Sequence, residues 1–102
     1  MPYLRSVNTI VALSTPPGSG ALGILRLSGD QALTLIQPFF PGIQSWTPRH
    51  AHFARFVVDG NVLDEVVAIA FPGPNSYTGE DVVELSFHGS PFILESALNA
   101  LL

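Results

Sequence analysis

Two charged residues lie in segments that otherwise consist mainly of apolar side chains. Arg26 is in the stretch GILRL, and Glu84 is in the stretch DVVELSF. A charge in an apolar strand must be paired, solvated on an exposed face, or used to hold a ligand. The pattern therefore leaves two interpretations open. One is a mutual Arg26–Glu84 salt bridge or simple surface exposure, and the other is a ligand-binding role.

A glycine-rich segment, GSGALG at residues 18–23, matches the G-x-G-x-x-G fingerprint of dinucleotide-binding proteins. In that motif the third glycine opens a helix that meets the pyrophosphate, and an acid about 20 residues further on holds the ribose. Here ILRLS and a glycine follow Gly23, which favours a strand, and no acidic residue lies between Gln31 and Val58. A P-loop is excluded because the chain contains no lysine. The segment is interpreted as a turn that joins two strands.

The histidines could in principle bind a metal ion. His50 and His52 are two residues apart in a predicted strand, so their side chains would point to the same face. No third ligand is evident, because His88 is distant and the chain has no cysteine. We therefore expect no metal site. No G-x-S-x-G motif is present, and no catalytic residue is predicted.

The composition is unusually apolar for a small domain. Of the 102 residues, 47% are hydrophobic and 12% are charged, which suggests that part of the apolar surface faces a second copy or another domain. The net charge of −4 argues against a nucleic-acid surface. No apolar run approaches the roughly 18 residues that a membrane helix needs, and no signal peptide is evident. The absence of cysteine fits a reducing compartment.

Glycine and proline divide the chain into elements of the order β-β-α-β-β-β-α. The predicted strands cover residues 9–14, 22–28, 50–58, 62–71 and 81–89. This order predicts an α+β fold for residues 1–102, with a mixed, mostly antiparallel sheet and two or more helices.

Local signals predict the turns and the helix ends. Asp59-Gly60 between apolar runs predicts a hairpin with a type I′ turn. Ser28 and Gln31 form an S-x-x-Q capping box before the first helix, and Ser90 with Pro91 predicts the start of the second. The second helix reaches the last residue without a C-cap, so we expect the chain to be the front part of a longer protein.

Two longer stretches carry a resemblance to a known family. FPGPNSYTGEDVVELSFHGSP at 71–91 and TPPGSGALGILRLSG at 15–29 resemble the N-terminal domain of the MnmE (TrmE) family of bacterial and organellar tRNA-modifying GTPases. The sequence LDE at 63–65 also resembles the family, which has a similar Leu-Asp at this position. The likeness covers nearly the whole chain from Thr9 onward. Ala21 and Ser90 depart from it, since many members have glycine at these positions.

The resemblance implies a module that binds tetrahydrofolate, similar to the folate domains of the glycine-cleavage T-protein, and that forms a homodimer. It implies Arg26 and Glu84 as folate contacts, with a further basic contact beyond residue 102. A carboxylate suits the adjacent N–H donors of a pterin, and a guanidinium suits the carbonyls and glutamate tail of folate. The alternative is a dimerisation or docking module that has no competent ligand site in these residues.

The resemblance further implies a cytoplasmic protein in which a helical domain and an inserted GTPase domain follow. In that family the whole protein acts with a flavoprotein of the MnmG (GidA) type. Together they modify C5 of the tRNA wobble uridine, and 5-formyltetrahydrofolate or a related folate supplies the one-carbon unit. GTP, Mg²⁺ and K⁺ belong to the GTPase domain, which lies outside these 102 residues. We therefore expect no GTP hydrolysis from this chain alone, and contact with tRNA only through the parent protein.

Overall fold

The computed structural model describes residues 2–6, 9–14, 23–74 and 79–102, and within the first two segments it describes only the side chain of Val11. The strands are β1 (Pro2–Ser6), β2 (Thr9–Ser14), β3 (Gly23–Ser28), β4 (His52–Val58), β5 (Asn61–Phe71) and β6 (Val82–Phe87). The helices are α1 (Ala32–Ile36), the single 3-10 turn η1 (Gln37–Phe39) and α2 (Pro91–Leu101).

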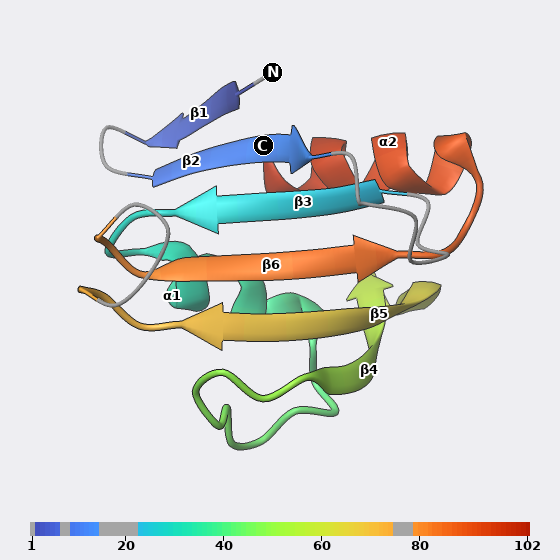
Figure 1. Cartoon of the computed structure of the whole chain (residues 1–102). Coiled ribbons are helices and arrows are strands. Elements are labelled where there is room, and N and C mark those ends of the chain that lie inside the picture. The colour runs from blue at the N-terminus through green and yellow to red at the C-terminus, as the bar shows by residue number, and fades with distance from the viewer. Residues whose placement is uncertain (1, 7–8, 15–22, 75–78) are drawn as a thin grey trace.

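The strands form one sheet in the order β1-β2-β3-β6-β5-β4 (Figure 1). Within the described part of the chain, each strand runs antiparallel to its neighbours. The prediction of an α+β fold with a mostly antiparallel sheet is therefore confirmed. The edge strand β1 was not predicted from the sequence. The central pair, β3 and β6, is joined by no hairpin, because α1, β4 and β5 lie between them in the sequence.

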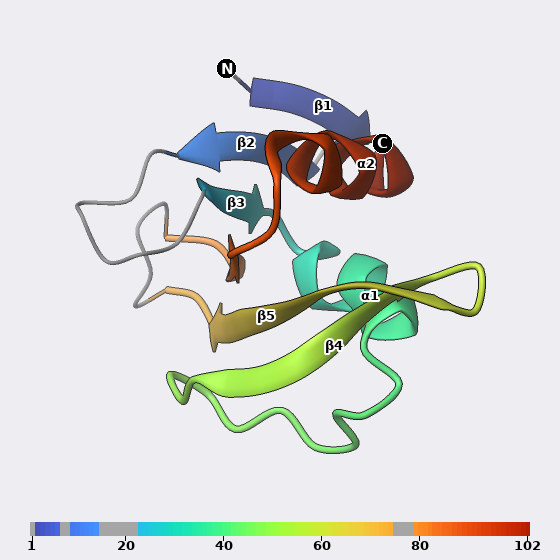
Figure 2. The same cartoon turned by 90° about the vertical axis from the view of Figure 1, so that its right-hand side faces the viewer.

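Both α-helices lie on the same side of the sheet, as the two perpendicular views show (Figures 1 and 2). We call this side the helix face and the opposite side the open face, which no described helix covers. Strand alternation sorts the side chains between the two faces. Leu25 and Leu27 of β3, with Val83, Leu85 and Phe87 of β6, are buried under the helices.

Aromatic side chains fill the part of the core below β4 and β5. The ring of the fully buried Phe56 lies 5.1 Å from Phe39, 5.4 Å from Phe40 and 5.3 Å from Phe87 between centroids. Trp46 extends this cluster by an edge contact with Phe40 at 5.6 Å. The cluster fixes η1 and the segment after it against the sheet, since offset and edge-to-face rings are the favoured packing arrangements.

Two local predictions are confirmed. Asp59 and Gly60 have φ values of 51° and 81°, as a type I′ turn requires, and Val58 pairs with Asn61 on either side of them. Ser90 caps α2, because its hydroxyl accepts a hydrogen bond from the backbone N–H of Ile93 at 3.3 Å.

Two predictions need correction, and a third falls on residues outside the described ones. The capping box is wrong: Ser28 stays in β3 opposite Val82, and α1 starts after Gln31 with no side-chain cap from that residue. The strand predicted at 50–58 begins only at His52. The glycine-rich turn falls on residues 15–22, outside the described residues, but Gly23 opens a strand and not the helix that a dinucleotide site needs.

Candidate functional site on the open face of the sheet

The two charged residues singled out in the sequence meet on the open face. Arg26 of β3 and Glu84 of β6 are directly opposite each other in the antiparallel ladder. Nε and Nη2 of Arg26 donate to the same oxygen, Oε2 of Glu84, at 3.0 and 2.6 Å. The Arg26 side chain is 31% exposed and that of Glu84 is 13% exposed. The salt-bridge interpretation is therefore confirmed, and the pair sits at the centre of the sheet.

The pairing register defines what surrounds this ion pair. Ile69 of β5 lies directly beside Glu84 on its other side, and Ser86 lies between Ile24 and Val67. Ile24, Val67, Ile69 and Ser86 are all half-buried. The ion pair is thus set in a partly apolar surface that the described helices leave uncovered.

This arrangement offers hydrogen-bonding capacity to a ligand. Because both bonds from Arg26 go to Oε2, no described residue donates to Oε1 of Glu84. A carboxylate oxygen accepts charge-assisted hydrogen bonds, which are about twice as strong as neutral ones. A partly exposed ion pair contributes little to stability, about 0–1 kcal/mol for surface pairs. Stability alone is therefore a weak reason for placing this pair in an apolar surface.

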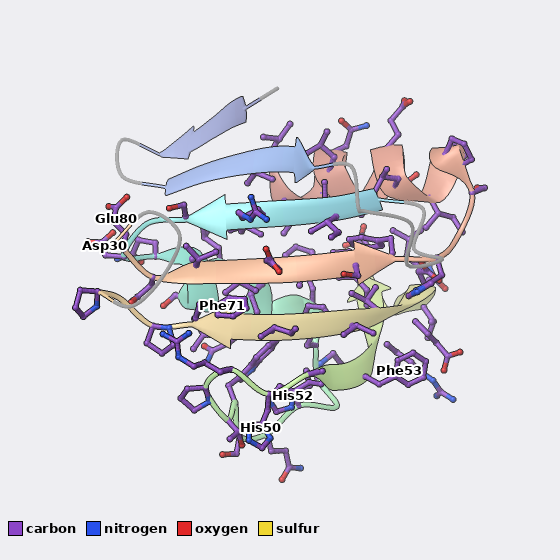
Figure 3. All side chains as sticks on the ribbon, in the orientation of Figure 1. Asp30, His50, His52, Phe53, Phe71 and Glu80 are labelled. Carbon is purple, nitrogen blue, oxygen red and sulfur yellow. The ribbon has the colours of Figure 1, made fainter. Side chains whose placement is uncertain are left out.

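Arg49 lies near one end of the open face. Its guanidinium carbon is 5.7 Å from the centroid of the Phe71 ring, within the range of a cation–π contact. Its backbone N–H donates to the Ala70 carbonyl at 2.8 Å, and its φ is 64°. Sequence reasoning missed this contact, because a positive φ at an arginine has no local sequence signal. Phe71 and Phe53, both on this face by register, lie toward opposite ends of it (Figure 3).

Asp64 fixes the backbone at the other end of β6. Its Oδ2 accepts hydrogen bonds from the backbone N–H groups of His88 and Gly89, each at 2.9 Å. Its Oδ1 accepts from the N–H of Glu65 at 2.8 Å. This carboxylate therefore ties β5 to the turn between β6 and α2. The sequence held one signal for it, the LDE stretch that resembles the family, but no indication of its partners.

The three histidines are not brought together as a metal site. His50 precedes β4, and the ring nitrogen Nε2 of His52 lies 3.1 Å from the donating N–H of Thr47 (Figure 3). The His52 ring also packs on Trp46 at 5.2 Å. Among residues 23–74 and 79–102, no three His, Asp or Glu side chains are grouped so as to hold a metal ion.

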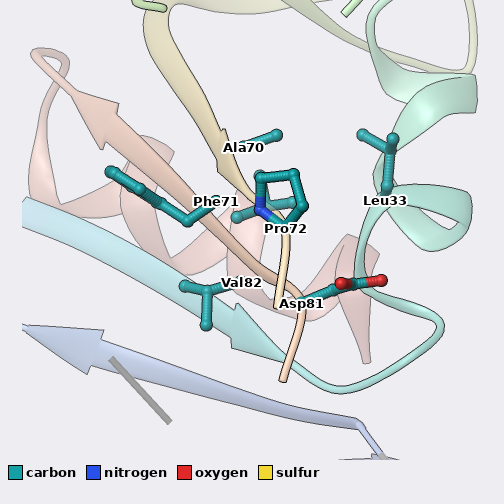
Figure 4. A pocket seen from close by; sticks show the side chains of 7 residues that line it. Leu33, Ala70, Phe71, Pro72, Asp81 and Val82 are labelled. Atoms are coloured by element: carbon teal, nitrogen blue, oxygen red, sulfur yellow. The ribbon is translucent and has the colours of Figure 1, made fainter. Parts of the chain in front are cut away.

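A small pocket lies where β5 ends and β6 begins, next to α1 (Figure 4). It is lined by Leu33, Ala70, Phe71, Pro72, Asp81, Val82 and Val83. Its volume is about 100 Å³, well below the roughly 300–1,000 Å³ of typical ligand pockets. Oδ1 of Asp81 accepts from the N–H of Gly73 at 2.9 Å, so this carboxylate already holds the loop. The Arg26–Glu84 region is the stronger candidate site.

Comparison with known proteins gives the family. Residues 9–102 match the family described as GTP-binding protein TrmE N-terminus. The chain belongs to the TrmE N-terminus family. It is 52% identical over 96 residues to the tRNA modification GTPase MnmE of Myxococcus xanthus (strain DK1622), covering 92% of this chain and 22% of that protein. It is 46% identical over 100 residues to the MnmE of Proteus mirabilis (strain HI4320), covering 97% of this chain and 22% of that protein.

Membership of the TrmE N-terminus family confirms the resemblance seen in the motifs. The chain spans about a fifth of the length of these two relatives, since it covers 22% of each. Within the described residues, no helix is both long and apolar enough to cross a membrane. Of the residues singled out for a site, the fold brings Arg26 and Glu84 together.

Proposed function

We propose that this domain binds 5-formyltetrahydrofolate or a related tetrahydrofolate through Arg26 and Glu84. The observation that carries the proposal is the ion pair at the centre of a sheet face that no described helix covers, bordered by half-buried aliphatic side chains. A folate combines a flat ring, N–H donors, carbonyl groups and an anionic tail. Oε1 of Glu84 can accept from ring N–H groups, and the guanidinium of Arg26 can donate to carbonyl or carboxylate oxygens.

The apolar neighbours support the same ligand class. A flat ring placed over Ile24 or Ile69 would remove apolar surface from water beside the charged pair. Partial burial of Glu84, at 13% exposure, strengthens a hydrogen bond to its carboxylate relative to one in bulk water. A dinucleotide fits less well, because Gly23 opens a strand and offers no helix N-terminus for a pyrophosphate.

Titration calorimetry with 5-formyltetrahydrofolate tests this proposal. We expect Arg26→Ala and Glu84→Ala each to weaken binding by tenfold or more, as loss of a charge-assisted hydrogen bond predicts. Arg55→Ala and Glu65→Ala are matched controls, because these residues pair across β4 and β5 on the same face and are exposed. The exchanged variant Arg26→Glu with Glu84→Arg keeps the opposite charges but reverses them, so we expect it to fold and not to bind.

The proposed site is wrong if folate binds and neither single substitution weakens it. NAD serves as a negative control, and we expect no heat of binding from it. Thermal unfolding of every variant separates loss of binding from loss of fold.

We also propose that the domain forms a homodimer. Phe53 of β4 is 68% exposed, points to the open face and lies opposite the half-buried Val67. β4 is an edge strand of the described sheet, and large exposed apolar groups at such an edge favour association. Light scattering tests this: we expect Phe53→Ser to shift the mass to that of a monomer. Phe92→Ser, which removes a 74% exposed phenylalanine from α2, is the control. A wild-type monomer at high micromolar concentration would refute the dimer.

In this proposal the parent protein is a tRNA modification GTPase, as its MnmE relatives are named, and it acts in the cytoplasm. The folate held by this domain would supply the one-carbon unit added at C5 of the wobble uridine. An MnmG-type flavoprotein would be the partner of the parent protein, and GTP, Mg²⁺ and K⁺ would bind elsewhere in it. If no folate binds but the dimer forms, the domain is a dimerisation or docking module.

A further inference from the structure

The strand β6 carries a second polar side chain on the open face. Ser86 is two residues beyond Glu84, so strand alternation places both on that face, about 7 Å apart along the strand. Ser86 is half-buried, and its hydroxyl forms no hydrogen bond with another described residue. A partly buried hydroxyl without a partner among the described residues is available to a ligand.

The neighbours of Ser86 define the space around its hydroxyl. The cross-strand register puts Ile24 of β3 on one side and Val67 of β5 on the other. Both neighbours are larger than serine, so the hydroxyl lies between two aliphatic side chains. The equivalent position beside Glu84 is occupied on one side by the guanidinium of Arg26. Polar groups on this part of the face therefore continue along β6, while β5 presents Val67, Ile69 and Phe71.

We propose that Ser86 is a further ligand contact, and that the bound ligand lies lengthwise along β6. This inference rests on the proposed folate-binding function and extends the same site. In this arrangement one end of the ligand contacts the Arg26–Glu84 pair. The two-residue spacing along β6 then places the middle of the ligand beside residue 86. The middle of a folate carries an amine, an aromatic ring and an amide. These groups can exchange a hydrogen bond with a hydroxyl and pack on Ile24 and Val67.

Three substitutions separate the hydroxyl from the shape of the side chain. Ser86→Val removes the hydroxyl and introduces a β-branched side chain that suits a strand. Ser86→Thr keeps the hydroxyl in a side chain of nearly the same shape as valine. Ser96→Ala is the control, because Ser96 is on α2, on the helix face, and its hydroxyl donates to the Phe92 carbonyl at 2.9 Å.

Titration calorimetry with 5-formyltetrahydrofolate is the readout, with thermal unfolding to verify the fold of each variant. We expect Ser86→Val to weaken binding about tenfold, Ser86→Thr by less than threefold, and Ser96→Ala not at all, since one lost hydrogen bond changes affinity by about this factor.

The outcomes distinguish the inference from the function on which it rests. If Arg26→Ala and Glu84→Ala weaken binding while Ser86→Val does not, the lengthwise placement is overturned and the proposed function stands. If binding is insensitive to Arg26 and Glu84, or the chain binds no folate, the proposed function fails and the role of Ser86 fails with it. Equal weakening by Ser86→Val and Ser86→Thr shows a steric effect and overturns the hydrogen bond.

Discussion

The Asp64 carboxylate provides the most direct test of how the fold is held together. It accepts three backbone hydrogen bonds, from Glu65, His88 and Gly89, at 2.8, 2.9 and 2.9 Å. The last two donors belong to the turn that leads from β6 into α2. Replacing Asp64 with alanine removes all three bonds at once, and no described residue stands ready to replace the acceptor.

The expected loss in the free energy of unfolding depends on how exposed the three backbone donors are. A hydrogen bond to a charged group contributes about 1.5–3 kcal/mol, but water can replace part of this at exposed groups. The bonds from Glu65 and His88 are exposed and the bond from Gly89 is partly buried. We take about 1 kcal/mol for each, so Asp64→Ala should lower the free energy of unfolding by about 3 kcal/mol. For a domain of this size, that lowers Tm by about 12–24 °C.

Asp64→Asn should cost roughly half as much. The amide keeps one oxygen that can accept from His88 and Gly89, but its NH₂ group would face the N–H of Glu65. Asp30→Ala is the control, because Asp30 is exposed and forms no hydrogen bond to another described residue.

Urea and thermal unfolding give the free energies, and hydrogen exchange gives the local effect. We expect the amides of His88 and Gly89 to exchange faster in Asp64→Ala than in the wild type. If Asp64→Ala costs less than about 1 kcal/mol, water replaces the carboxylate fully and the reasoning is refuted.

Three further substitutions test other parts of the fold by urea unfolding. Gly73→Ala should lower the free energy of unfolding, because a Cβ there would lie 2.7 Å from the backbone oxygen of Gly79. Gly42→Ala is the control and should be neutral, because a Cβ there meets nothing within 4 Å; equal effects of the two substitutions would contradict this reasoning. Ser90→Ala should cost about 1 kcal/mol through loss of the α2 cap, and an unchanged midpoint would show that the cap contributes nothing. Phe56→Ala should cost about 3–5 kcal/mol because the ring is fully buried among three other aromatic rings, and a loss below 2 kcal/mol would count against a tightly packed cluster.

The predictable parts of the fold are those that depend on neighbouring residues. The type I′ turn at Asp59-Gly60 and the cap of α2 at Ser90 were predicted because a turn or cap is specified within about four residues. The capping box at Ser28 failed because a longer-range interaction prevails. The pairing of Ser28 with Val82 extends β3, and the N–H of Gly29 donates to the Asp81 carbonyl at 2.9 Å.

The candidate site shows the same division. The sequence singled out Arg26 and Glu84, because charges in apolar strands need an explanation, but it left open whether they meet. These residues are 58 positions apart, and their contact depends on β3 and β6 being neighbours in the sheet and in the observed register. A shift of one residue in that register would place the two charges on opposite faces.

The amino-acid sequence by itself indicated the strands β2 to β6, the position of the hairpin turn, and the two charges that needed partners. Only the tertiary structure decided that β3 lies beside β6, that Asp64 reaches the turn before α2, and that Ser86 lies between Ile24 and Val67. The physical reason is the separation along the chain over which each interaction acts. Backbone propensity and alternation act between close neighbours in the chain. Strand order and register are set by the burial of whole apolar faces against one another.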